Sequence, residues 1–188
     1  TGLDGQYIPN NGDELVYTTW DLSGLPQYEM RRRRADRSQA EETLLQSKSA
    51  LYSWDFAPDG QSLLYGSNTY GTWLLPLAGE RKPVQFLPPG GAQQYFQYSP
   101  DGRWVAYSST ESGHGEVFVA PFPGPGRRWQ ISTRGGYWPS WRADGREIIY
   151  LDSGGTITTV PVATHGDALT VGMPKTAFHL QPPEANNS

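Results

Sequence analysis

Four stretches of this chain share one pattern, in which a glycine-containing turn joins two apolar runs. The stretches are PNNGDELVYTT, APDGQSLLYGS, SPDGRWVAYSS and RADGREIIYLD. The turn glycines are Gly12, Gly60, Gly102 and Gly145, so successive units are 48, 42 and 43 residues apart. A repeat of this length constrains the fold more strongly than any local signal, because every unit must form the same supersecondary element.

Each unit begins as an antiparallel pair of strands. The residues four positions before the turn glycine are all apolar or aromatic: Ile8, Phe56, Tyr98 and Trp141. Asp-Gly and Asn-Gly pairs favour a tight hairpin because they tolerate positive φ. The second strand then puts an aliphatic residue and a tyrosine on one face, which we expect packing between units to bury. These pairs are Leu15 and Tyr17, Leu63 and Tyr65, Val105 and Tyr107, and Ile148 and Tyr150.

Two further strands follow in each unit. We expect them at residues 28–33 and 42–45, 72–77 and 83–87, 116–121 and 128–132, and 156–162 and 175–180. The 22 glycines and 16 prolines lie between apolar runs, and aromatic residues reach 13%, which is typical of an all-β protein with short strands. A period of about 40–45 residues matches a four-stranded β-propeller blade. The sequence therefore predicts an all-β propeller with four antiparallel four-stranded blades.

We expect a single propeller domain, or a fragment of one, over residues 1–188. Its blades cover about residues 1–47, 48–90, 91–134 and 135–182, and residues 183–188 form a flexible tail. Each of the four blades is complete within one continuous stretch of the sequence, whereas most propellers complete one blade with strands from both chain ends. Three arrangements stay open: a closed four-bladed ring, an arc excised from a larger ring, and half of a ring that a second copy completes. We favour the excised arc.

The repeat resembles the WD40-like repeat of the TolB type, whose Ser-Pro-Asp-Gly turn precedes an alternating strand that ends in tyrosine. SPDGRWVAYSS matches this pattern in full, while PNNGDELVYTT lacks the Pro-Asp pair. The stretch from Ser99 to Asp152 also resembles the C-terminal propellers of large bacterial proteins, above all Ser/Thr protein kinases. The resemblance implies a sensor or interaction domain of a bacterial signalling protein, outside the cytoplasm. It carries no catalytic residue across, because the kinase motifs are absent.

Composition excludes several kinds of partner. A formal net charge of -4 and a pI near 5.3 argue against binding to nucleic acid. The absence of cysteine excludes disulfides and thiolate metal sites. No apolar run approaches the ~20 residues of a membrane span, so we expect no membrane contact from this segment. We expect no cofactor and no metal.

Candidate ligand-binding residues lie in loops that propeller geometry brings to one rim of the central channel. These loops join second to third strands, or lead into the first strands near Tyr95 and Tyr137. A rim lined by aromatic residues suits a protein, a peptide or a small ligand such as a sugar. The candidates are Trp20, Asp21, Asn68, Tyr70, Tyr95, Glu111, His114, Arg134 and Tyr137.

Other prominent residues receive structural interpretations. We assign Trp54, Trp104, Trp138 and Trp141 to packing within and between blades. The basic run Arg31–Arg34, flanked by acidic residues, is interpreted as a solvated strand. Aspartates that suggest calcium come one per turn and are assigned to the turns themselves. They are Asp21, Asp55, Asp59, Asp101 and Asp144.

We expect a binding, scaffolding or sensor module and not an enzyme. The three histidines, His114, His165 and His179, are scattered, and no catalytic triad is apparent. An enzyme stays open as the alternative, because similar repeats build the propellers of oligopeptidases and polysaccharide lyases. Two further possibilities are a homodimer formed through open blade edges and an arc that serves only as packing inside a larger ring.

Overall fold

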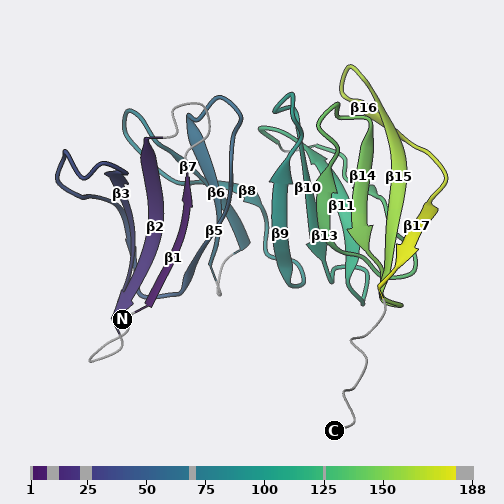
Figure 1. Cartoon of the computed structure of the whole chain (residues 1–188), viewed down its shortest axis with the longest axis horizontal. Helices are drawn as coiled ribbons and strands as arrows, with labels where there is room; N and C mark the ends of the chain where they lie inside the picture. Colours follow the sequence, from purple (N-terminus) through teal and green to yellow (C-terminus); the bar gives the residue numbers. More distant parts are fainter. Residues whose placement is uncertain (1, 8–12, 22–26, 68–70, 125, 181–188) are drawn as a thin grey trace, which may run out of the picture.

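The structure is a computed structural model that describes residues 2–7, 13–21, 27–67, 71–124 and 126–180. The described residues form strands and no helix, so none of them belongs to a helix that could cross a membrane. They build four antiparallel sheets, set side by side along the long axis of the molecule (Figure 1). The predicted all-β fold of four-stranded blades is confirmed.

The strands follow the chain in order within each blade. Blade one contains β1 (Gly2–Tyr7), β2 (Glu14–Asp21), β3 (Gln27–Arg34) and β4 (Glu42–Ser47). Blade two contains β5 (Leu51–Phe56), β6 (Ser62–Ser67), β7 (Gly71–Pro76) and β8 (Val84–Leu87). Blade three contains β9 (Gln93–Tyr98), β10 (Trp104–Ser109), β11 (Glu116–Pro121) and β12 (Trp129–Gln130). Blade four contains β13 (Tyr137–Trp141), β14 (Glu147–Leu151), β15 (Thr156–His165), β16 (Ala168–Val171) and β17 (Lys175–His179).

Blade four departs from the prediction at its outer edge. β15 runs past the predicted end at residue 162, and its last residues form a hairpin with the additional strand β16. β17 lies where the fourth strand is predicted, at residues 175–180, and pairs with the first half of β15. The extra hairpin is held because Val162 and Leu169 are buried against the apolar core between blades three and four.

Apolar cores between adjacent blades hold the sheets together. The aliphatic-tyrosine face of β6 packs against blade one, that of β10 against blade two, and that of β14 against blade three. The predicted pairs are buried in blades two to four. In blade one, no described blade covers the corresponding face, and there Tyr17 is buried while Leu15 is half-buried.

The first strands of successive blades, β1, β5, β9 and β13, lie next to one another. Two side chains link neighbouring first strands by accepting hydrogen bonds from backbone N–H groups. The Tyr98 N–H donates to Asp55 Oδ2 at 2.8 Å, and the Trp141 N–H donates to Gln97 Oε1 at 2.7 Å. Asp55 and Gln97 occupy the same position in their units, so the repeat uses one device at two blade junctions.

The four blades form an open arc. Blade one and blade four lie at opposite ends of the long axis, and each blade contacts the next one along the chain (Figure 1). The described residues therefore do not form a closed four-bladed ring, one of the three arrangements that the sequence leaves open. Residues 183–188, expected as a flexible tail, lie outside the described residues.

Three of the five aspartates assigned to turns act as predicted, whereas Asp21 is the last residue of β2. Asp59, Asp101 and Asp144 each accept a hydrogen bond from the N–H two residues later, at 2.9, 3.1 and 3.0 Å. The following glycines have φ near +69°, which is why glycine is needed there. The assignment of Asp55 to a turn is wrong. It lies within β5 and also binds the Phe56 N–H at 2.9 Å.

The arginine run on β3 is a paired surface strand. Arg31 and Arg33 contact Glu41 at 3.2 and 3.6 Å, and Arg32 contacts Glu42 at 2.7 Å. Arg34 contacts Asp36 at 3.3 Å. Since acidic neighbours already accompany each arginine, the structure agrees with a solvated strand and not with an anion site.

We expect Asp55 to make stability fall as pH rises. Burial raises the pKa of its carboxyl to about 6, above the unfolded value of about 3.9. The folded state therefore binds the proton more tightly, so this contribution is complete below the unfolded pKa and is lost as pH passes through 6. Between pH 4 and 7 the loss amounts to about 2–3 kcal/mol at most.

Urea unfolding of the natural chain and of Asp55→Asn, followed by tryptophan fluorescence at pH 4 to 7, checks this expectation. As pH rises, the unfolding free energy of the natural chain should fall relative to that of Asp55→Asn. A difference that stays constant with pH would contradict the assignment.

Candidate functional site

Among the described residues, three of the loops that the sequence assigns to one rim contact one another: those before β9, after β10 and before β13. The loop before β9 and the loop after β10 exchange hydrogen bonds, since the Thr110 N–H donates to the Ala92 carbonyl and the Ala92 N–H donates to Thr110 Oγ1. One blade further along, the Gly136 N–H donates to the Gly115 carbonyl at 2.9 Å. The loops before β9 and before β13 are thus both fixed to the β10–β11 loop.

Five aromatic side chains form a row beside these loops, at the beginnings of β5, β9 and β13. We call this set the aromatic row: Tyr52, Trp54, Tyr95, Trp138 and Tyr137. In that order, successive ring centroids lie 6.1, 6.0, 5.2 and 6.2 Å apart. Tyr52 is 41% exposed and Trp138 is 54% exposed, while the other three are half-buried. The row therefore offers aromatic surface to solvent across three blades.

A β-bulge in each first strand creates the row. The register of β5, β9 and β13 shifts where the strand passes the buried tyrosine of the second strand. At this point Tyr95 has φ +57° and Trp138 has φ +51°. Positive φ is rare for bulky residues and costs of order 1–3 kcal/mol each. Bulges of this kind turn a side chain out of the alternation that would bury it.

The row borders a hollow of about 440 Å³ between blades two and three. Its floor is made by small residues, because Gly66, Gly71 and Gly91 line it. Gly66 is required by the row itself, since a Cβ there would lie 2.7 Å from the Trp54 indole nitrogen. Gln93 and Gln94 supply amide groups at the edge of the hollow. Among the described residues, those that line it carry no charge.

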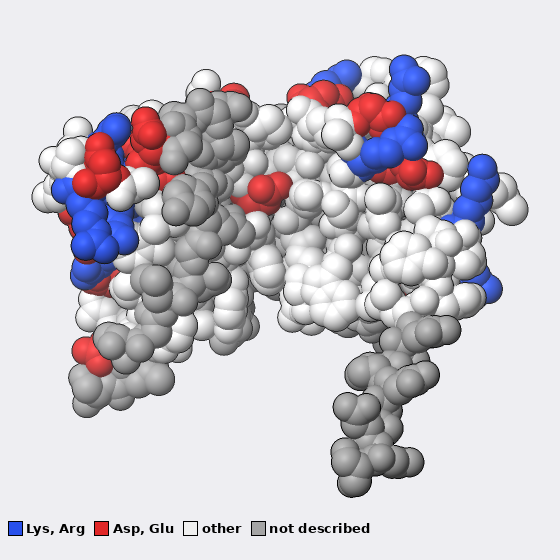
Figure 2. Space-filling model, in the orientation of Figure 1, with Lys and Arg blue, Asp and Glu red and all other residues white. Residues whose placement is uncertain are grey.

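Charge is concentrated elsewhere on the molecule. Figure 2 shows acidic and basic side chains gathered along the upper edge and over blade one, while the lower part of this face, over β9 and β13, is largely uncharged. The hollow beside Tyr52, Trp54 and Tyr95 is therefore apolar with a few amides, which is the usual character of a small-ligand site.

His114 and Glu116 form a fixed pair at one end of the row. His114 Nε2 lies 2.8 Å from Glu116 Oε1, and Glu116 is fully buried although His114 is exposed. The Ser132 hydroxyl and the Gly135 N–H also donate to this carboxylate. The Tyr137 ring lies against Gly115, where a Cβ would approach it to 2.5 Å. The pair thus holds the β10–β11 loop against the row.

The other predicted site residues are dispersed. Glu111 pairs with Arg128 at 2.6 Å, and Arg134 is exposed in the loop before β13. Trp20 and Asp21 line a separate hollow of about 390 Å³ on blade one. Asn68 and Tyr70 lie outside the described residues. Of the predicted set, the structure therefore brings together Tyr95 and Tyr137, with His114 adjacent.

The sequence interpretation missed Tyr52, Trp54 and Trp138 as site residues. The assignment of Trp138 to packing holds only in part: its ring lies 5.2 Å from that of Tyr95 in the neighbouring blade, but its side chain is 54% exposed, whereas Trp104 and Trp141 are buried as expected. A signal was present in the adjacent aromatic pairs Tyr95-Phe96 and Tyr137-Trp138. Neighbouring residues of a regular strand face opposite sides, so both members of such a pair cannot enter one core.

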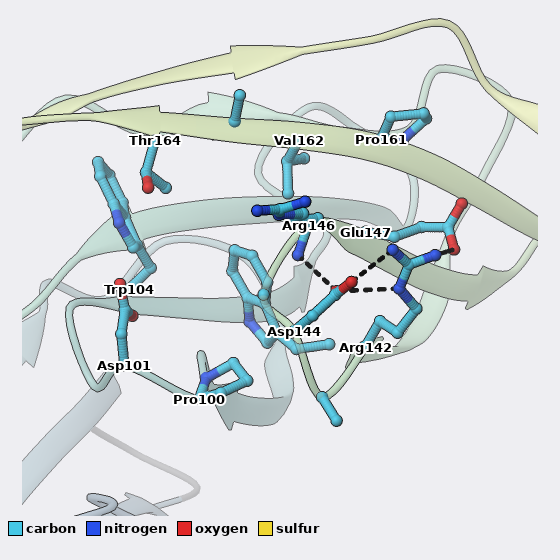
Figure 3. Close-up of a pocket in the computed structure, with 14 residues that line it drawn as sticks. Pro100, Asp101, Trp104, Arg142, Asp144, Arg146, Glu147, Pro161, Val162 and Thr164 are labelled. Atoms are coloured by element: carbon cyan, nitrogen blue, oxygen red, sulfur yellow. Dashed lines mark hydrogen bonds and ion pairs between the residues drawn. The ribbon is translucent and has the colours of Figure 1, made fainter.

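A larger hollow of about 870 Å³ lies at the opposite end of blades three and four, among their hairpin turns (Figure 3). Three of the charged groups that line it pair with one another. Arg142 contacts Asp144 at 2.6 Å and Glu147 at 3.2 Å, and the Arg142 guanidinium lowers the pKa of Asp144 to about 2. Because Arg142, Asp144 and Glu147 already pair with one another, this hollow is a weaker candidate for a ligand site than the aromatic row.

Solved structures of several propeller proteins resemble the chain. TolB from Acinetobacter baumannii is 16% identical, with a TM-score of 0.68 over 90% of this chain and 43% of its own. A periplasmic gluconolactonase from Pseudomonas aeruginosa is 20% identical, with a TM-score of 0.61 over 96% and 58%. An oligogalacturonate lyase in complex with manganese is 13% identical, with a TM-score of 0.69 over 86% and 51%.

These similarities show a TolB-like β-propeller fold. The chain spans between 43% and 58% of the length of the three proteins. Neither a protein-family model nor a curated protein matches the sequence. Within the described part of the chain, no three His, Asp or Glu side chains lie close enough together to hold a metal.

The expectation that the chain is not an enzyme is wrong as it stands. Proteins that share its fold include a gluconolactonase and an oligogalacturonate lyase. The lack of a known catalytic motif in the sequence therefore does not exclude catalysis, because one propeller scaffold carries unrelated functions. At 13–20% identity the likeness transfers the fold and no catalytic residue.

Because Trp138 is exposed and its backbone is strained, we expect its replacement to cost the fold little stability. Trp138→Gly removes the positive-φ penalty of about 1–2 kcal/mol but adds unfolded-state entropy worth about 0.5–1 kcal/mol. The free energy of unfolding should therefore stay within about 1 kcal/mol of the natural chain. Trp141→Ala, at a buried position of the same strand, should cost about 3–5 kcal/mol. Urea unfolding of both variants gives the comparison, and equal losses would contradict it.

Proposed function

We propose that the chain is a ligand-binding propeller module that engages its ligand along the aromatic row. The observation that carries the proposal is the pair of strained residues, Tyr95 and Trp138. Each has positive φ and contributes its ring to the exposed row. Strain of this kind, in residues that the core does not need, marks functional sites.

The row has further properties of a binding surface. Its rings are supported from beneath, since Trp54 packs on Phe96 at 6.0 Å and Phe96 stacks on the buried Tyr107 at 5.1 Å. Supported aromatic side chains lose little conformational entropy when a ligand binds. The loops beside them are joined by backbone hydrogen bonds, so the site is largely formed before binding.

We place this binding function in a larger bacterial protein, as a sensory or scaffolding part. The repeat motif supports this through its resemblance to the propellers of Ser/Thr kinases. An extracytoplasmic location is supported by the periplasmic gluconolactonase, a protein of the same fold. A protein or peptide and a small ligand both suit an aromatic rim, and a second copy of the chain at the open blade edges remains a prediction.

Removal of the two strained rings, those of Tyr95 and Trp138, should greatly weaken ligand binding. A panel of short peptides and oligosaccharides, screened by tryptophan fluorescence, identifies a ligand for the natural chain. The double variant Tyr95→Ala/Trp138→Ala should raise the dissociation constant at least tenfold, or about 1.4 kcal/mol. Phe178→Ala serves as the matched control, because Phe178 is 56% exposed on β17 and lies outside the row. Equal affinity in the double variant would refute the proposal.

Catalysis on the bound ligand is the second candidate, and the His114–Glu116 pair favours it. A buried carboxylate that orients an exposed imidazole is the arrangement that prepares a histidine to accept a proton. The pair stands next to Tyr137 at the end of the row.

If the chain turns over its ligand, His114→Ala should lower the rate at least a hundredfold. The ligand's dissociation constant should change less than threefold. His165→Ala, at an exposed histidine on β15, is the control. Turnover assayed by product formation decides the matter, and an unchanged rate in His114→Ala would remove the residue from this role.

A further inference from the structure

We propose that the ligand of the aromatic row is an uncharged oligosaccharide that lies along the row with successive sugar rings on successive aromatic rings. This inference rests on the proposed function and names the chemical class of its ligand. It follows from three properties of the surface: the spacing of the rings, the kind of polar group beside them, and the absence of charge.

The spacing of the rings suits a chain of pyranose units. Successive centroids from Tyr52 to Tyr137 lie 5.2–6.2 Å apart, which is comparable to the separation of neighbouring sugar rings in an extended oligosaccharide. The C–H groups on one face of a pyranose carry partial positive charge, and the face of an aromatic ring is negative. Neighbouring rings of the row are also turned relative to one another, by 67° between Trp54 and Tyr95 and 52° between Tyr95 and Trp138. A chain joined by rotatable glycosidic bonds can follow that twist.

The polar groups beside the row match hydroxyl groups. A hydroxyl both donates and accepts hydrogen bonds, and so does an amide side chain. Gln93 is held in place, because its Nε2 donates to the Pro88 carbonyl at 3.0 Å and its Oε1 accepts from the Thr72 hydroxyl at 3.2 Å. No hydrogen bond within the described part of the chain involves the exposed side-chain amide of Gln94. Gln94 is therefore available at the edge of the hollow to bind a sugar hydroxyl.

The absence of charged side chains around the hollow argues against an anionic ligand. Among the described residues, no Lys, Arg, Asp or Glu lines the hollow beside the row. A uronate, a sugar phosphate or a nucleic acid would need cationic groups there. The ligand class thus differs from the galacturonate polymer named for one protein of the same fold.

A proline-rich peptide is the strongest competitor, since such peptides also dock on aromatic surfaces. Proline-rich backbones present mainly carbonyl acceptors, so they require donors directed outward. Such a backbone would use only the donor half of the exposed Gln94 amide, whereas a sugar hydroxyl can use both its donor and its acceptor. The arrangement favours the oligosaccharide.

Isothermal titration calorimetry on the full chain tests the inference with five probes. Cellohexaose, maltohexaose and laminarihexaose are uncharged, hexagalacturonate is anionic, and decaproline represents the peptide. We expect at least one uncharged hexasaccharide to bind at a single saturable site. We also expect Trp138→Ala to weaken it at least tenfold, and Gln94→Ala threefold or more. Trp138→Phe should recover most of the affinity, and Phe178→Ala should change it less than twofold.

The outcomes distinguish the two proposals. Binding of decaproline or hexagalacturonate alone, lost in Trp138→Ala, would overturn the oligosaccharide inference and leave the proposed function standing. Binding of any probe that is unchanged in both Trp138→Ala and Tyr95→Ala would overturn both. Failure of all three uncharged hexasaccharides at millimolar concentration would overturn the inference, while the wider ligand panel still tests the proposed function. Near-ultraviolet circular dichroism of each variant confirms that the fold is retained.

Discussion

The packing of one blade against the next is the constraint on which the rest of the structure depends. A single four-stranded blade has two apolar faces and cannot bury either alone. The second strands of blades two to four therefore each send an aliphatic residue and a tyrosine into the preceding blade, as Val105 and Tyr107 do. Asp55 and Gln97 add hydrogen bonds that fix neighbouring first strands to each other. Together these contacts set the spacing and direction of all four sheets.

The same constraint shapes the candidate site. The buried tyrosines Tyr107 and Tyr150 each lie opposite two residues of the bulged first strand. At these two bulges Tyr95 and Trp138 have positive φ. The aromatic row is in contact with the core through Trp54, which packs on Phe96, and Phe96 in turn stacks on Tyr107. Such coupling gives a rigid surface, which reduces the entropy lost on binding.

The fold by itself does not decide the function. Propellers of this shape include TolB, a gluconolactonase and an oligogalacturonate lyase, so the argument must come from the site. Two features stand close together here: an uncharged aromatic surface and an oriented His114–Glu116 pair. The first provides for binding, and the second is the feature from which any chemistry on the bound ligand would begin.

The sequence by itself determined the repeat, the tight turns and the faces that become buried. These depend on local geometry, because an Asp-Gly turn and an aliphatic-tyrosine alternation act within a few residues, as at Asp101 and Tyr107. Only the tertiary structure decided that Trp138 faces solvent while Trp141 is buried three residues later. It also decided that Asp55 joins two blades instead of capping a turn. Both results follow from bulges and blade contacts, in which residues more than forty positions apart meet, and no local pattern encodes that register.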